Sequence, residues 1–215
     1  MTYHRERGKV DVKVVPKVCV ADPDMCLFQY TAIDEITRLQ FMAAYQEQSI
    51  YSFSYFLRKL RAWYARRGIE VEFVQTGNAF EFINRFSNSK HDLSILFEKT
   101  AAWLGIWHRL IRPYTMRHNG KVERRYREDQ KRFYPCHFFC CLGNFAKPLA
   151  VHNRYFNSLS MRSTHWMFPA KFTVQYVWQT CKYACNAFQT ALLHSVKIVL
   201  SFIFRWYLKR LFAVR

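Results

Sequence analysis

Acidic residues are scarce in this chain of 215 residues, and the last of them is Asp129. Lysine and arginine number 33 against 15 aspartates and glutamates, which gives a formal net charge of +18. Residues 130–215 contain 12 basic residues and no acidic one, so they carry +12 and the first 129 residues carry +6. An excess of this size predicts a polyanionic partner, with nucleic acid as the first choice and an anionic membrane as the second.

Glycine and proline are also few, at six each, and 51% of the residues are hydrophobic. This composition excludes collagen-like and low-complexity chains, because there is enough apolar surface to bury. No uncharged apolar run reaches the roughly 18 residues of a membrane-spanning helix, and the N-terminus, MTYHRER, lacks the apolar stretch of a secretion signal. The seven cysteines, an odd number, favour free thiols in a reducing cytoplasm over a disulfide framework.

Hydrophobic periodicity predicts an α/β order of elements. Strands are expected at residues 10–20, 27–33, 38–45, 69–76 and 106–111, and helices at 49–67, 92–104, 121–134 and 144–155. Ser49 or Ser52 is expected to cap the first helix, and Gly68 to end it. Three strands joined by short loops, followed by helical crossovers, predict a mixed five-stranded sheet with helices on its faces.

Two carboxylates stand out in this arrangement. Asp11 lies within a valine-rich strand, where a charge is costly unless it is paired or binds a metal ion. Glu123 begins a helix directly after the Asn119-Gly120 turn. Carboxylates on neighbouring elements suit Mg²⁺ or Mn²⁺, which prefer oxygen ligands and serve phosphoryl transfer. The alternatives are that Asp11 is a solvent-facing strand residue and that Glu123 is one of many solvated charges on its helix.

Four segments carry a resemblance to a known family: residues 9–13 (KVDVK), 30–38 (YTAIDEITR), 74–82 (VQTGNAFEF) and 112–124 (RPYTMRHNGKVER). In this order and spacing they resemble the retroviral-integrase-type catalytic core of bacterial insertion-sequence transposases, over roughly residues 8–177. The resemblance implies a ribonuclease-H-like fold and DNA strand transfer by an Asp-Asp-Glu (DDE) triad with Mg²⁺ or Mn²⁺.

Carried over residue by residue, Asp11 matches the first catalytic aspartate and Glu123 the catalytic glutamate, both as metal ligands. The second aspartate is expected at position 77, where this chain has Gly77. The missing carboxylate predicts weakened metal binding and weak or absent strand transfer, with a rate loss on the order of a thousandfold. Glu81 is the nearest replacement carboxylate. Asp34 falls outside the triad and is expected to pair with Arg38 or with the backbone of Thr37.

The helix that carries Glu123 is strongly basic. Its lysines and arginines are candidates for contact with DNA phosphates beside the active site, or else form a solvated helix face. The candidates are Lys121, Arg124, Arg125, Arg127 and Lys131.

Residues 178–215 form a separate basic, apolar tail. Helical spacing of apolar residues over 192–207, with Lys197 and Arg205 among them, predicts an appended basic helix. It is either read-through sequence past the usual end of the family, which we favour, or a membrane-surface helix.

The first catalytic strand begins about ten residues into the chain, whereas such transposases normally carry DNA-reading modules ahead of the core. We therefore expect a truncated transposase core in the bacterial cytoplasm, associated with the nucleoid when it is bound to DNA. DNA, a second copy and a full-length transposase are the expected partners, and a small-molecule substrate is not expected. The alternatives are a catalytically dead nucleic-acid-binding remnant and a basic membrane-surface protein.

Overall fold

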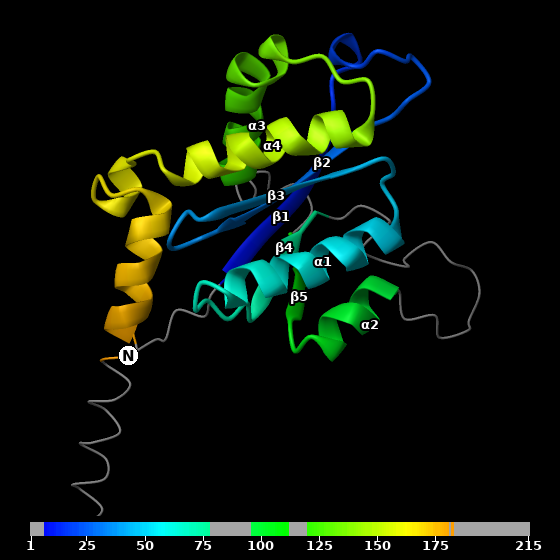
Figure 1. Ribbon diagram of the computed structural model, residues 1–215. Coiled ribbons are helices and arrows are strands. Elements are labelled where there is room, and N and C mark those ends of the chain that lie inside the picture. Colours follow the sequence, from blue (N-terminus) through cyan, green and yellow to red (C-terminus); the bar gives the residue numbers. More distant parts are fainter. Residues whose placement is uncertain (1–6, 78–95, 112–119, 181, 183–215) are drawn as a thin grey trace, which may run out of the picture. The chain divides into compact units, whose positions relative to one another are not determined.

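The computed structural model describes residues 7–77, 96–111, 120–180 and 182 (Figure 1). The chain divides into two compact units, Met1–Val174 and Gln175–Arg215. In the second unit residues 175–180 and 182 are helical, and the helix predicted within 192–207 lies outside the described residues. The predicted functional division after residue 177 stays a prediction. Among the described residues, no helix has the length and apolar character needed to cross a membrane.

The first unit contains the mixed five-stranded sheet that the sequence predicts. The strands are β1 (Arg7–Val14), β2 (Phe28–Asp34), β3 (Gln40–Tyr45), β4 (Phe73–Thr76) and β5 (Trp107–Leu110). Their order is β3-β2-β1-β4-β5, with antiparallel pairing from β3 to β1 and parallel pairing from β1 to β5. The helices are α1 (Ile50–Ala65), α2 (Leu96–Trp103), α3 (Gly120–Arg132) and α4 (Leu142–Asn157).

Two strands are shorter than predicted, by three residues or more. The strand expected at 10–20 ends at Val14, because Pro16 has no backbone N–H to donate and Lys17–Cys19 forms a short 3₁₀ turn. The strand expected at 69–76 begins at Phe73. Ile69 is buried as a strand residue would be, but its N–H donates to the carbonyl of Tyr64 at the end of α1 and is not available to a sheet neighbour.

Both predicted ends of α1 are confirmed. The Ser49 side chain accepts a hydrogen bond from the backbone N–H of Ser52 at 3.1 Å, which satisfies one of the free donors at the start of a helix. Gly68 has a φ of +73°, a backbone conformation that glycine adopts at little cost, and it closes the helix.

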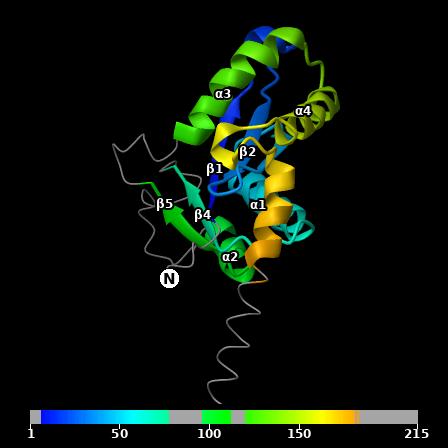
Figure 2. The same cartoon turned by 90° about the vertical axis from the view of Figure 1, so that its left-hand side faces the viewer.

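The helices cover the sheet on opposite faces (Figure 1, Figure 2). On the α1 face the ring of Tyr30 packs 4.5 Å from that of Phe53, measured between centroids. On the α4 face the backbone of Gln40 exchanges two hydrogen bonds with the Asn157 side chain, at 2.9 and 2.8 Å. Since side chains alternate along a strand, the polar residues of β1 point to the α3 and α4 face.

His108 of β5 is a half-buried titratable group on the opposite face. Its Nε2 lies 2.7 Å from Thr76 Oγ1, and its ring packs against Phe97 with the centroids 4.9 Å apart. Burial lowers the pKa of His108 to about 4.

We expect acid to destabilise the fold through His108. The unfolded chain binds a proton at this histidine near the ordinary pKa of 6.5, and the folded chain does so only near 4. Stability is therefore complete above about pH 6.5 and is lost as the pH falls towards 4. Urea unfolding at about pH 7 and pH 5 should show a smaller loss for His108→Gln than for the wild type. An equal loss in both proteins would contradict the assignment.

Candidate functional site

Asp11 stands near the middle of β1, on the sheet face that α3 covers. It pairs with Thr31 of β2, and its Oδ1 accepts a hydrogen bond from the N–H of Val12 at 3.0 Å. Burial, and after it the nearby charge of Asp11, raises the pKa of the Tyr126 phenol on α3. The charge of Asp11 therefore acts on a side chain of this helix.

Two sets of contacts align α3 with β1. At one end Lys9 of β1 and Lys121 of α3 share the Glu35 carboxylate, at 3.3 and 3.2 Å. At the other end Lys13 Nζ donates to the side chain of Gln130. The four steps along β1 from Lys9 to Lys13 span about 13 Å, and so do the nine steps along α3 from Lys121 to Gln130. The two elements therefore run side by side over this stretch. Asp11, midway between the two lysines of β1, lies opposite the middle of this helical segment.

Glu123 occupies the first turn of α3. Tyr126 and Gln130 follow it at spacings of three and seven residues, so the three side chains share one stripe of the helix. Because Lys13 bonds to the Tyr126 carbonyl at 3.4 Å and to the Gln130 side chain, this stripe is turned towards β1. Glu123 thus lies on the β1 side of α3, one turn from the tyrosine that neighbours Asp11.

Gly77 directly follows β4, the strand that pairs with β1 in parallel. Lys9 and Gln75 form the last pair of these two strands, and extending that register by two residues would place Gly77 level with Asp11. A Cβ added at Gly77 would meet no atom within 4 Å. This position therefore has room for a side chain.

The donor set for a metal ion is incomplete. Nowhere in the described part of the chain do three or more His, Cys, Asp or Glu side chains gather. Of the three positions that the family resemblance implies, Asp11 and Glu123 carry carboxylates and Gly77 carries none. The residues present do not form a three-carboxylate site, and two carboxylates would hold a divalent cation with reduced affinity. Glu81, the nearest other carboxylate to position 77 in the sequence, lies outside the described residues.

The five basic candidates on α3 occupy different environments. Arg124, Arg127 and Lys131 are exposed, and Lys121 is half-buried with its bond to Glu35. Arg125 is buried, and its guanidinium lies 2.7 Å from Asp129, which is fully buried. The Arg125 charge is therefore already paired inside the protein.

Asp34 has the structural role that the sequence predicts. Its Oδ2 accepts hydrogen bonds from the backbone N–H groups of Thr37 and Ile36, at 2.6 and 3.1 Å. Burial raises the pKa of this carboxyl, and the hydrogen bonds oppose that shift. Asp34 thereby shapes the turn between β2 and β3.

Sequence reasoning missed Glu35, which joins β1 to α3, and the buried contacts of Asp129. The one available signal for Glu35 was its place directly after a strand that ends beside β1. The one local signal for Asp129 was Arg125, four residues before it on the helix, whereas its partners Gln29 and His152 lie 100 and 23 residues away.

Comparisons with known proteins give a fold. No family model and no curated protein matches the sequence. The BIV integrase catalytic core domain matches the structure with a TM-score of 0.57 and 14% sequence identity, over 83% of this chain and 99% of that chain. The fold is integrase-like. Its mixed sheet and flanking helices are those of the ribonuclease-H-like integrase core, as the sequence predicts.

A second structure that matches this chain belongs to a larger assembly. This is a chain of the simian T-cell lymphotropic virus intasome in complex with PP2A regulatory subunit B56 gamma, with a TM-score of 0.55 and 13% identity. The match covers 79% of the present chain and 54% of that chain, so the integrase-like core spans about half of the intasome chain's length. At such identities the likeness establishes the fold alone.

Proposed function

We propose that this integrase-like core is the catalytic core of a DDE transposase or integrase, which binds DNA and transfers strands weakly or not at all. One juxtaposition carries the proposal. Asp11 lies on the face of β1 that contacts α3, beside the α3 stripe that begins with Glu123, and Gly77 directly follows β4, the strand paired with β1. These are the strand and helix positions from which the family resemblance draws its three carboxylates.

In this proposal Asp11 and Glu123 hold a divalent cation, Mg²⁺ or Mn²⁺, with reduced affinity. A bound cation would supply Lewis-acid activation of a hydroxyl and neutralise charge on a phosphate. The chain's own contribution is to hold the two carboxylates on rigid elements, because the shared Glu35 contact and the Lys13 contact fix α3 along β1. The expected partners are DNA and a further subunit, either a second copy or a full-length transposase.

The exposed side chains of Arg127 and Lys131 extend the Glu123 side of α3 and form the proposed DNA contact. Contact of this kind is made with phosphates and weakens as salt rises. The direct test of the whole proposal is DNA strand transfer by the wild-type chain and by Gly77→Asp, with DNA binding measured on the same proteins.

Removing these two charges is expected to weaken duplex binding at every sequence tested. The Arg127→Gln/Lys131→Gln protein should show a salt slope, log affinity against log salt, lower by about two than the wild type. The matched control is Arg61→Gln/Arg66→Gln, which removes two exposed charges from the α1 side of the sheet. Equal slopes in both double variants would contradict the proposed interface.

A further inference from the structure

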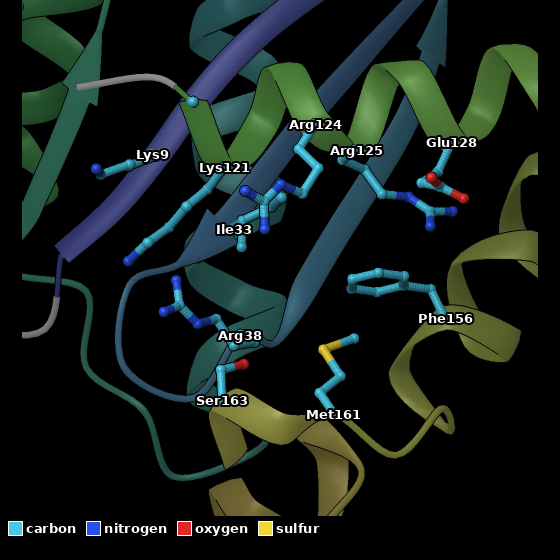
Figure 3. Close-up of a pocket in the computed structure, with 11 residues that line it drawn as sticks. Lys9, Ile33, Arg38, Lys121, Arg124, Arg125, Glu128, Phe156, Met161 and Ser163 are labelled. Carbon is cyan, nitrogen blue, oxygen red and sulfur yellow. The ribbon is translucent and has the colours of Figure 1, made fainter. Parts of the chain in front are cut away.

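A cavity of about 600 Å³ opens on the other side of α3 (Figure 3). Lys121, Arg124, Arg125 and Glu128 line it at spacings of three, four and seven residues, so they form a second stripe, turned away from Glu123. The turn after β2 and the segment that follows α4 complete the walls. The volume is within the range of small-molecule sites.

The charges of this cavity do not balance. Five of its lining residues are basic, and the one acidic residue, Glu128, pairs with Arg132 at 3.2 Å. Within the described ranges, Arg38 and Arg124 make no ion pair. Two guanidinium groups therefore enter one cavity without an ion-pair partner in the part of the chain that the structure describes.

The fold holds these cations together. Arg38 has a φ of +64°, an uncommon conformation outside glycine, in the turn that Asp34 shapes. Its side chain enters the cavity from below α3, while Lys121 and Arg124 enter from the helix (Figure 3). Burial and the like charge of Arg38 lower the pKa of Lys121, against the attraction of Glu35. A bound anion would relieve this repulsion.

The opposite wall is apolar. Phe156 and Met161 line it, and Ile33 and Ser163 also line the cavity (Figure 3). The guanidinium group of arginine can donate two parallel hydrogen bonds to the oxygens of a phosphate. An apolar wall of this extent can pack against a sugar or base attached to that phosphate. A ligand with an anionic end and an apolar body fits both walls.

We propose that this cavity binds the phosphate of a nucleotide through Arg38, Lys121 and Arg124, with the sugar or base against Phe156 and Met161. The nucleotide is either free or part of a DNA strand. The site goes beyond the strand-transfer function, because it uses the stripe of α3 that faces away from Glu123. Nucleotide binding is therefore expected in the wild type and in Gly77→Asp alike.

The test uses the full chain and three probes: 5′-dAMP, inorganic phosphate and a short single-stranded oligonucleotide. The Arg38→Asn/Arg124→Gln variant is expected to bind dAMP at least about tenfold more weakly than the wild type, measured by saturation-transfer NMR. Asparagine tolerates the positive φ at position 38, and Arg124→Gln alone provides a second variant on an exposed helix position. Arg61→Gln/Arg66→Gln removes the same charge elsewhere and should leave dAMP binding within about twofold.

The other probes identify the source of the nucleotide. Loss of both dAMP and oligonucleotide binding supports a site open to free nucleotides, and loss of oligonucleotide binding alone supports a site for a DNA strand. Phe156→Leu should weaken dAMP binding and spare inorganic phosphate. The proposal is overturned if the pocket variants lose no more affinity than the charge-matched control for both dAMP and the oligonucleotide, or if phosphate alone binds as tightly as dAMP.

Discussion

Gly77→Asp is expected to raise Mg²⁺-dependent DNA strand transfer by at least about a thousandfold over the wild-type chain. The substitution adds a carboxylate directly after β4, where the extended register of β1 and β4 would place it level with Asp11. An added Cβ at this position meets nothing within 4 Å, so the new side chain has room. The new carboxylate completes the set that the wild-type chain lacks.

Gly77→Asn is the matched control, since it adds a side chain of the same shape without a charge. It should stay at the wild-type level. Asp11→Asn combined with Gly77→Asp should return activity to that level as well, because the restored carboxylate then lacks its neighbour. Wild-type protein that cuts and joins DNA with Mg²⁺ as fast as Gly77→Asp would refute the proposed impairment.

Mn²⁺ binding gives a second measurement that does not depend on DNA. Gly77→Asp should bind Mn²⁺ at least about tenfold more tightly than the wild type, and Gly77→Asn should not. If Gly77→Asp changes neither Mn²⁺ affinity nor strand transfer, position 77 is not the third carboxylate position of a metal site. A gain in Mn²⁺ affinity without strand transfer would support the metal site and contradict the proposed activity.

The sheet could be predicted because its signals are local. Alternating valines in β1 and the serine and glycine at the ends of α1 act over a few residues. The start of β4 could not be predicted in this way. Ile69 lies in an alternating pattern and is buried like a strand residue, but its N–H donates a hydrogen bond to the end of α1. Periodicity reports which side chains are buried, and it does not report which backbone groups pair.

The site was predictable only in part for a related reason. Asp11 and Glu123 could be singled out by type and motif, but their surroundings come from pairings such as Lys9 and Lys121 with Glu35. The sequence alone predicts one set of basic residues on α3, which either contact DNA phosphates or form a solvated face. The helix in fact has two stripes, and the spacing of Lys121, Arg124, Arg125 and Glu128 was the available signal for the second.

Asp129 is expected to be the costliest carboxylate to remove. It is fully buried. Its Oδ2 accepts a hydrogen bond from Gln29 Nε2 at 2.8 Å, and its Oδ1 lies 2.8 Å from His152 Nε2 and 2.7 Å from the Arg125 guanidinium. Asp129→Leu would leave the buried Arg125 charge without its partner, at a cost of about 3–5 kcal/mol in unfolding free energy.

A second substitution separates the charge from the packing. In Arg125→Leu/Asp129→Leu both charges are gone, so the double variant should be more stable than Asp129→Leu alone. Glu128→Gln is the control on the same helix, since its ion pair with Arg132 is exposed and should contribute less than about 1 kcal/mol. Urea unfolding measures all three. If the double variant is the least stable, the cost arises from lost packing around Asp129 and Arg125. That result would contradict the prediction that the unpaired Arg125 charge causes it.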